Sequence, residues 1–411
     1  MRIAIVGAGL TGLTAGFRLS QSKHQVTIFE KEGQAGGLAA SFQKKTWRWP
    51  LENFFHHLFT TDGDARQLIS ELGLETKLFF KNPQTSIYYQ NIIFPFSSPA
   101  EILQAPFFSL PEKLRLGLVT AYLKATNNWQ ALEKTTASNW LARFYGPRPY
   151  RILWEPLLAG KFAGQKDLIS MAWFWARVKK RSRQLGYLQG GFQVLIDKLL
   201  TEIQNHGQNH GQKNHGQIIL NHEIKNLNDI YHLSKFDRAI ITTPADKFFP
   251  TQLPPMIGAL NLVLELKEKF FPDNTYWLNI NDAAFPFVAV VEHTNFVNKK
   301  YYGGHHILYV GGYYPQNHPF FKMTKKQILK KFLPYLQKLH PRLSVISYQL
   351  SANLYSQPIV PINHSQNLPS FQTAIPHVFL ANMQMVYPWD RGINYAIQMG
   401  NSVADEVAKN S

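Results

Sequence analysis

The chain has 411 residues, of which 45% are hydrophobic and 17% charged, a composition typical of a globular protein and not of a disordered one. It contains no cysteine, which excludes disulfide bonds, thiolate metal ligands, a thiol nucleophile and a cysteinyl link to a cofactor. Lysine and arginine number 43 against 26 acidic residues, and the net charge of +17 fits a polyanion, an anionic membrane face or a phosphorylated substrate as partner.

The sequence gives no indication of a membrane-spanning or secreted protein. No apolar run approaches the roughly 18 residues that a transmembrane helix needs. A predicted strand begins near Arg2 and a glycine loop follows at Gly7, so removal of a secretory signal would destroy that loop. We therefore expect a cytoplasmic protein.

The N-terminal segment has the order strand, glycine turn, helix. Residues 2–6 predict a short apolar strand, the segment GAGLTG follows from Gly7 to Gly12, and the apolar spacing over 13–19 predicts a helix. In a dinucleotide site Gly7 makes the tight turn, Gly9 lets backbone amides approach a pyrophosphate, and Gly12 lets the helix pack on its strand. The helix N-terminus adds positive potential for the phosphates. This order predicts a dinucleotide-binding domain.

A second strand, predicted over 25–29, ends at Glu30, 18 residues after Gly12. At that spacing a carboxylate accepts hydrogen bonds from an adenosine ribose. The alternative is that Glu30 is only a solvated strand end.

The segment after Glu30 distinguishes between dinucleotides. A plain nicotinamide domain would continue with an amphipathic helix, whereas here Gly33, Gly36 and Gly37 precede an aromatic stretch over 47–57. Irregular, glycine-rich backbone lying against a flat group favours a flavin.

The C-terminus supplies a matching half. A predicted strand over 378–381 leads into NMQMVYPWDRG, and apolar residues from 393 onward follow helical spacing. A helix that begins after Gly392 directs its positive end at a ligand. Asp390 either contacts the flavin or caps this helix.

Together, the N-terminal GAGLTGL, the strand that ends at Glu30, the glycine pair 36–37 and the C-terminal ANMQMVYPWDRGINYA resemble the FAD-dependent amine oxidases, protoporphyrinogen oxidases and carotenoid desaturases. UDP-galactopyranose mutase is a more distant relative of that family. The resemblance implies FAD as cofactor. The residues expected to hold it are Gly7, Gly9, Leu10, Thr11, Gly12, Glu30, Lys31, Gly36, Gly37, Leu38, Asp390, Arg391, Gly392 and Asn394.

The resemblance also implies an α/β fold with a discontinuous, Rossmann-like FAD-binding domain and an inserted α+β substrate domain. We expect the FAD domain to comprise residues 1–60, 184–250 and 375–411. The substrate domain would combine a helical insertion, 61–183, with a β-rich segment, 251–374.

The resulting functional prediction is an FAD-dependent oxidoreductase that removes a hydride from a small, apolar or unsaturated substrate. The alternatives are a non-redox sugar-nucleotide mutase and a protein that keeps FAD for structural reasons. The positive charge adds peripheral association with an anionic membrane, at its inner face, as a further expectation. Nucleic acid is not an expected partner, because no aromatic residues interleave with the basic cluster as in a nucleic-acid module.

Two groups of histidines remain as candidates. His56 and His57 follow the glycine pair and either serve the flavin, as a base or covalent anchor, or are packed residues. An Asn-His-Gly-Gln unit recurs from 205 to 217, but it has no nearby carboxylate and carries glycine in every unit, so we expect a surface loop and no metal. No catalytic residue is predicted.

Overall fold

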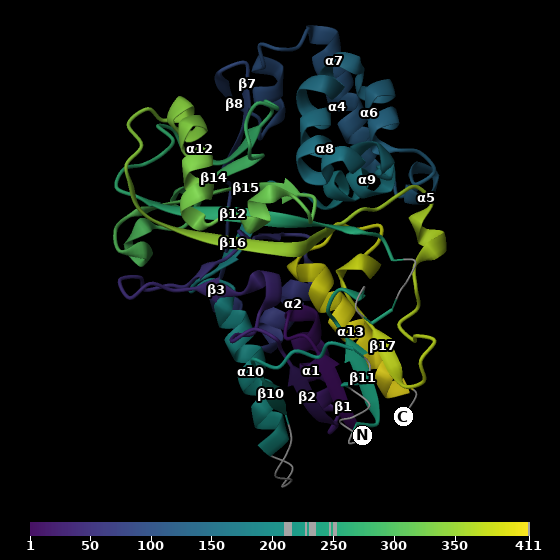
Figure 1. Cartoon of the computed structure of the whole chain (residues 1–411). Helices are drawn as coiled ribbons and strands as arrows, with labels where there is room; N and C mark the ends of the chain where they lie inside the picture. The colour runs from purple at the N-terminus through teal and green to yellow at the C-terminus, as the bar shows by residue number, and fades with distance from the viewer. Residues whose placement is uncertain (209–215, 227, 230–235, 246–247, 250–252, 410–411) are drawn as a thin grey trace.

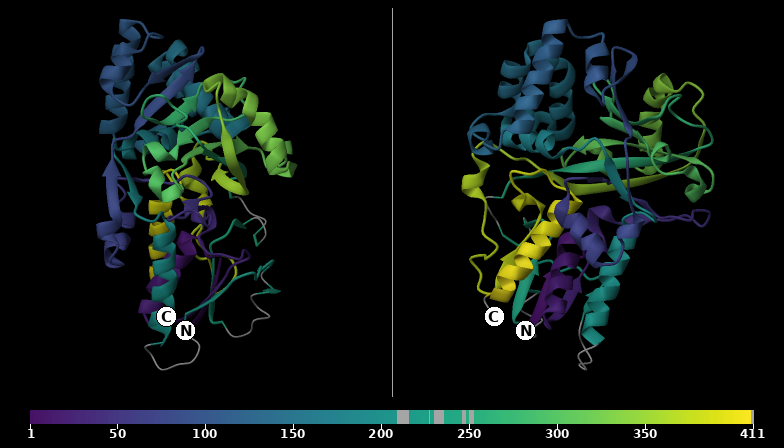
Figure 2. Two further views of the ribbon diagram at one scale, coloured as in Figure 1. Left: turned by 90° about the vertical axis from the view of Figure 1, so that its left-hand side faces the viewer. Right: turned by 180° about the vertical axis from the view of Figure 1, so that it is seen from behind.

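The computed structural model describes residues 1–208, 216–226, 228–229, 236–245, 248–249 and 253–409. In Figure 1 the lower part, which contains both termini, is a layer of helices on a parallel sheet. A broad, mostly antiparallel sheet crosses the middle, and a bundle of helices occupies the end opposite the termini (Figures 1 and 2). Residues 209–215 of the expected histidine loop lie outside the described residues.

The five strands of the lower sheet are parallel, in the order β10-β2-β1-β11-β17. They are β1 (Arg2–Val6), β2 (Gln25–Phe29), β10 (Gln217–Ile219), β11 (Arg238–Ile241) and β17 (Val378–Leu380). Strands from three separated stretches of sequence therefore build one sheet, so the expected discontinuous Rossmann-like domain is confirmed.

Three helices lie side by side along this sheet: α10 (Gln193–Gln208), α1 (Leu10–Gln21) and α13 (Ile393–Lys409). The contact of α1 with α13 requires a glycine, because a Cβ at Gly400 would lie 2.6 Å from the carbonyl oxygen of Thr11. The C-terminal helix is thereby packed directly on the helix that follows the glycine loop.

The middle sheet has seven strands in the order β16-β12-β15-β14-β13-β7-β8. They are β7 (Gln84–Tyr89), β8 (Ile92–Pro95), β12 (Met256–Leu266), β13 (Thr275–Ile280), β14 (Ala289–Glu292), β15 (His306–Tyr314) and β16 (Val345–Pro358). Helix α12 (Lys325–Leu339) covers one face through Ile328, Phe332 and Leu336. All positions of β12 are buried, which matches a central strand covered on both faces.

The first insertion is less helical than expected. Its residues 84–95 form a hairpin that joins the middle sheet through a parallel pairing of β7 with β13. Gln90 and Asn91 make the two-residue turn with φ values of 50° and 63°, the conformation that matches the twist of paired strands. The strand residues are rich in Ile, Tyr and Phe, which favour a pleated, half-buried surface.

Short strands connect the lower domain to the middle sheet. They pair β3 (Ser41–Phe42) with β4 (Leu51–Glu52), and β9 (Leu185–Leu188) with β5 (Leu58–Phe59) and β6 (Leu78–Lys81).

The remaining helices are α2 (Gly63–Glu71) beside α13, and a bundle of α3 (Pro99–Gln104), α4 (Leu110–Ala125), α5 (Trp129–Leu132), α6 (Ala137–Tyr145), α7 (Pro147–Pro149), α8 (Glu155–Phe162) and α9 (Met171–Lys180). A capping box begins α3: the Ser98 hydroxyl accepts from the amide of Glu101, whose carboxylate accepts from the amide of Ser98. Within the described residues, no helix has both the length and the apolar character needed to span a bilayer.

Candidate functional site

In the glycine loop between β1 and α1, protein atoms leave no room for a side chain at two glycines, whereas the third faces open space. Gly7 has a φ of +104°, and a Cβ there would lie 2.8 Å from Thr242 Oγ1. A Cβ at Gly12 would lie 2.0 Å from the carbonyl oxygen of Gly7. In contrast, a Cβ at Gly9 would meet no described atom within 4 Å. The loop backbone is therefore closely packed by protein atoms at Gly7 and Gly12, and it is accessible to a ligand at Gly9.

The start of α1 is suited to an anion. Gly9 is its N-cap residue and provides no side-chain cap, and the first turn contains no acidic residue. The first amides of a helix have no intrahelical acceptor, and the helix dipole adds positive potential there. Leu10 and Thr11 lie in this first turn, so their amides have no intrahelical acceptor and their role toward a phosphate stays a prediction.

Glu30 is placed at the same loop. It is buried, its Oε2 accepts from the amide of Ala8 at 2.8 Å, and its Oε1 accepts from the amide of Glu32 at 2.9 Å. The interpretation of Glu30 as a solvated strand end is thus wrong. Because a carboxylate has about four acceptor positions, this one can also accept from ribose hydroxyls. The side chain of Lys31 instead lies in solvent, 3.3 Å from Glu32.

The second glycine pair lies against the first loop. Gly36 donates its amide to the carbonyl of Ala8 at 2.8 Å and forms an isolated bridge with Gly9. Gly37, with a φ of +57°, brings its Cβ position to 3.2 Å from Gly9 Cα, and half-buried Leu38 follows it. The structure therefore gathers the two predicted glycine segments around Gly9.

The C-terminal motif reaches the same end of the sheet but uses its polar side chains differently from the prediction. Gly392 is exposed and precedes α13, and a Cβ there would meet no described atom within 4 Å. The Asn394 side chain accepts from the amide of Ala65 at 3.0 Å and donates to Asp64 at 3.2 Å. These bonds to α2 use one donor and one acceptor position of the amide group, so the remaining amide positions and the backbone of Asn394 at the helix start are left for a cofactor.

Asp390 is the centre of a charged cluster. Its carboxylate accepts from Lys161 Nζ at 2.9 Å, Arg177 at 2.6 Å and Trp173 Nε1 at 3.0 Å. Burial would raise the pKa of Asp390, but the charges of Lys161, Arg177 and Arg391 outweigh it and hold the pKa well below its usual range. The carboxylate bonds the amide of Arg391, ahead of the helix, so its interpretation as the cap of α13 is wrong. Asp390 instead joins the C-terminal motif to α8 and α9.

Arg391 retains unused donor capacity. One guanidinium nitrogen donates to the hydroxyl of Tyr313 at 2.7 Å, while the buried Nε has no hydrogen-bond partner among the described residues. A buried donor without a partner costs free energy, so a ligand acceptor at this position is the simplest complement.

These features fit a flavin dinucleotide: bare backbone at Gly9, an uncapped helix start, a ribose acceptor at Glu30 and an unsatisfied donor at Arg391. Known proteins agree with this assignment. Residues 10–408 match the model of the family described as flavin-containing amine oxidoreductases. The chain belongs to this family. The predicted resemblance, fold class and flavin cofactor are thereby confirmed.

Two curated relatives and one solved structure illustrate the match. Mitochondrial protoporphyrinogen oxidase of Nicotiana tabacum is 30% identical over 175 residues, 41% of this chain and 34% of the relative. The 15-cis-phytoene desaturase of Synechococcus elongatus is 27% identical over 158 residues, 35% of this chain and 33% of the relative. The alignments therefore span about a third of the length of these relatives. Reduced UDP-galactopyranose mutase superposes with a TM-score of 0.74 at 14% identity, covering 100% of this chain and 96% of that one, which shows a shared fold alone.

In this member of the family, the lowered pKa values of His56 and His57 keep both rings neutral at neutral pH. Burial, the nearby His56 and the charges of Arg181 and Arg177 lower the pKa of His57 to about 3. Burial lowers the pKa of His56 to about 4, and Arg391 adds to this effect against the hydrogen bond with Phe54. The ring of His57 lies against Phe59 and Trp277, with centroids 5.2 and 6.2 Å away. These surroundings support the interpretation of His57 as a packed residue.

Sequence reasoning missed a buried acid on β4. Glu52 is 1% exposed, accepts from the hydroxyl of Tyr187 at 2.6 Å and accepts from the amide of Phe192 at 2.7 Å. Burial raises its pKa against these hydrogen bonds. Tyr309 of the middle sheet donates to the Glu52 carbonyl at 2.8 Å. Glu52 thus joins the flavin domain to the middle sheet. No local sequence motif predicts this role.

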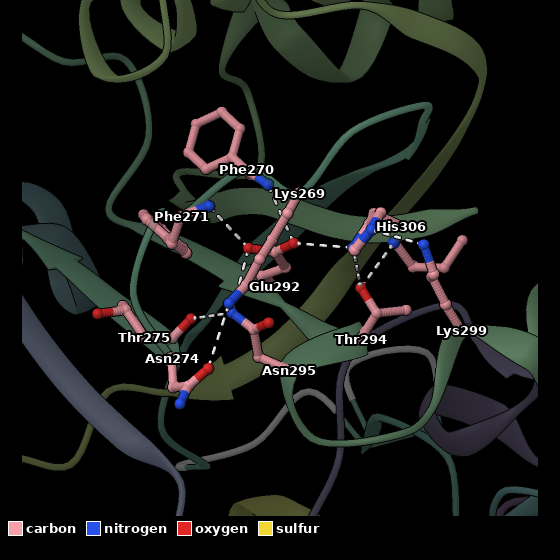
Figure 3. A network of polar contacts seen from close by, with 11 residues as sticks. Lys269, Phe270, Phe271, Asn274, Thr275, Glu292, Thr294, Asn295, Lys299 and His306 are labelled. Atoms are coloured by element: carbon pink, nitrogen blue, oxygen red, sulfur yellow. Dashed lines mark hydrogen bonds and ion pairs between the residues drawn. The ribbon is translucent and has the colours of Figure 1, made fainter. Parts of the chain in front are cut away.

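A second buried acid, Glu292, lies within the middle sheet and is shown in Figure 3. It is fully buried, accepts from the amides of Phe270 and Phe271 at 3.0 and 2.8 Å, and is 3.3 Å from His306. Asn295 also donates to it at 3.1 Å. With both oxygens occupied by protein donors, Glu292 has a structural role in holding the loop before β13.

Proposed function

We propose that this family member is an FAD-dependent oxidoreductase that removes a hydride from a small, apolar or unsaturated substrate. The observation that carries the proposal is the open backbone of Gly9, bounded by the start of α1, the Glu30 carboxylate and Gly36. When bound, the flavin supplies a hydride acceptor, and the protein needs to contribute only position, electrostatics and exclusion of water.

The chain's own residues are suited to binding and positioning the flavin. Amides at the start of α1 bind the pyrophosphate, and Glu30 accepts from the ribose hydroxyls. Arg391 and Arg177 leave the region around Asp390 with more positive than negative charge, which stabilises an anionic group placed beside them. The site residues and the domain boundaries remain predictions on this basis.

The apolar character of the substrate is supported by the relatives named protoporphyrinogen oxidase and phytoene desaturase. The rings around the Asp390 cluster are packed core and do not bear on the substrate: Trp173 and Trp175 are 1% and 2% exposed, Arg177 lies 5.1 Å from the Trp173 ring centroid, and Trp389 stacks on Trp175 at 5.3 Å.

A specific observation supports a second candidate, a flavin-dependent sugar-nucleotide mutase. Arg177 and Arg391 together exceed the single charge of Asp390, and Lys161, whose pKa is lowered by burial, lies beside them, which suits a diphosphate. In such an enzyme, turnover would require reduced flavin and would yield no net oxidation.

One preparation tests both candidates. The purified protein should show a flavin absorbance spectrum, and acid precipitation should release the flavin into the supernatant unless it is covalently held. Anaerobic addition of a reduced tetrapyrrole (a porphyrinogen), or of a polyene hydrocarbon that still has saturated carbon–carbon bonds, should bleach the spectrum if the oxidoreductase proposal holds, because each can give a hydride to the flavin. Isomerisation of a nucleotide sugar only after reduction by dithionite would favour the mutase. A colourless protein that binds no FAD would contradict both.

We also propose that the protein associates peripherally with an anionic membrane, on the inner face. The net charge of +17 supports this, because anionic lipid attracts clustered lysine and arginine within a Debye length. Binding to anionic vesicles that weakens as salt increases is the expected result.

A further inference from the structure

Helix α4 carries an exposed apolar stripe. Leu110, Leu114, Leu118 and Tyr122 are 64%, 57%, 73% and 53% exposed. They recur every four residues, so they occupy one face of the helix over about 18 Å. The opposite face is buried through Leu116 and Leu123, where α4 packs on α6 and α9. Helix α4 is therefore well packed on one side, and the stripe is a second apolar face that is directed to solvent.

The apolar surface extends beyond α4. Leu103, on α3, is 54% exposed, and Phe144, on α6, is 40% exposed. The Tyr122 ring stacks on Trp140 at 6.4 Å, and Trp140 contacts Phe144 at 4.4 Å. We name this surface, formed by Leu103, Leu110, Leu114, Leu118, Tyr122 and Phe144, the α4 face. Contiguous exposed patches of this kind mark protein or membrane contacts.

Cations border the stripe on both sides. At 100° per residue, Arg115 lies along one edge of the stripe, and Lys113 and Lys124 lie along the other. Their side chains donate to carbonyl oxygens: Lys113 to Leu103, Arg115 to Phe144 and Arg143, and Lys124 to Arg181.

These partners carry no charge, so they do not neutralise the cations. In the described part of the chain, none of the three cations is within ion-pair distance of a carboxylate, whereas nearby Glu112 is paired with Arg148 at 3.3 Å. An apolar stripe between unneutralised cations is the pattern of a helix that lies in a membrane interface.

We infer that the α4 face is the surface that docks on an anionic lipid bilayer, with α4 parallel to the membrane plane. The inference rests on the membrane association proposed above and identifies where it occurs. A second copy of the chain is a poorer occupant, because pairing two such faces would bring their cationic borders together. The face belongs to the helical bundle at the far end of the molecule from the termini (Figures 1 and 2).

The test measures vesicle sedimentation of the FAD-loaded protein with phosphatidylcholine vesicles and with vesicles of equal parts phosphatidylcholine and phosphatidylserine. The variant Leu114→Gln with Leu118→Gln changes two exposed side chains and should fold normally. The matched control, Ile346→Gln with Leu354→Gln, alters two exposed apolar residues of β16, which are 46% and 40% exposed. A third variant, Lys113→Gln with Lys124→Gln, tests the charges.

Wild type and the β16 control should bind the anionic vesicles equally. The leucine variant should bind them at least about tenfold more weakly than wild type. The lysine variant should lose binding mainly at low salt. Equal binding by wild type and the leucine variant would overturn the inference while leaving membrane association intact. Absence of wild-type binding would overturn the association itself. A wild-type dimer that the leucine variant dissociates would assign the α4 face to a second copy and also overturn the inference.

Discussion

The carboxylate of Asp390 lies 2.9 Å from Nζ of Lys161, although 229 positions separate them in the chain. This contact ties the C-terminal motif to the helical bundle, while α13 ties the same motif to α1. The end of the chain therefore holds the cofactor domain and the bundle in one arrangement.

Replacing Asp390 by Asn should destabilise the protein by about 3–5 kcal/mol, because removing one partner of a buried pair leaves the other charges uncompensated. The loss is measured by urea unfolding with saturating FAD. Adding Lys161→Met to Asp390→Asn should recover part of it, since neighbouring mutations are coupled. Asp167→Asn, in an exposed pair with Lys166, is the control and should change little. Additive effects of the two buried mutations would contradict the cluster.

The sequence predicted the local elements of the site well because their signals are local. The strand at 2–6, the glycine spacing and the helix after Gly392 each depend on neighbouring residues, and all three appear in the structure. Capping at Ser98 was predictable for the same reason.

Other features depend on tertiary contacts and carry no such signal. Lys161 and Arg177 look like any basic residues of a helix until the fold brings them to Asp390. The burial of Glu52 likewise follows from the sheet packed above it. The hairpin at 84–95 was predictable in principle, but its turn uses Gln90 and Asn91 without glycine, which weakens the usual hairpin signal.

Replacing Glu30 by Ala should raise the Kd for FAD by about 10- to 100-fold, since a hydrogen bond to a charged group contributes about 1.5–3 kcal/mol. Titration of the apoprotein with FAD, followed by flavin fluorescence, measures the change. Lys31→Ala is the matched control, because the Lys31 side chain is exposed and pairs only with Glu32. If both variants bound FAD equally well, Glu30 would not be the ribose ligand.

Acid should destabilise the protein through His57. The folded pKa of about 3 lies below the ordinary 6.5, so between these values the unfolded state binds a proton that the folded state does not. The free energy of unfolding should then fall with decreasing pH, by up to about 1.4 kcal/mol per pH unit from this residue. In His57→Phe, which keeps a ring against Phe59 and Trp277, the slope between pH 6.5 and 4 should be shallower. An unchanged slope, measured by urea unfolding at each pH, would show that His57 titrates normally.

Two glycines of the loop, Gly9 and Gly12, should separate folding from cofactor binding. Gly9 has a φ of −72° and a ψ of 173°, extended backbone that valine adopts readily, and its Cβ position is free of described atoms. Gly9→Val should therefore fold with the thermal stability of the wild-type apoprotein, yet retain no FAD, because the valine side chain occupies the space that the pyrophosphate needs.

Gly12→Val should instead fail to fold or lose most of its stability, since its Cβ would lie 2.0 Å from the carbonyl oxygen of Gly7. Gly63→Ala adds a Cβ in equally open space in α2 and should keep both stability and flavin. Absorbance of the purified proteins and thermal unfolding of their apo forms give the two readouts. A yellow Gly9→Val protein with wild-type FAD affinity would remove the glycine loop from the cofactor site, whereas a colourless, folded one would leave steric exclusion at Gly9 as the cause.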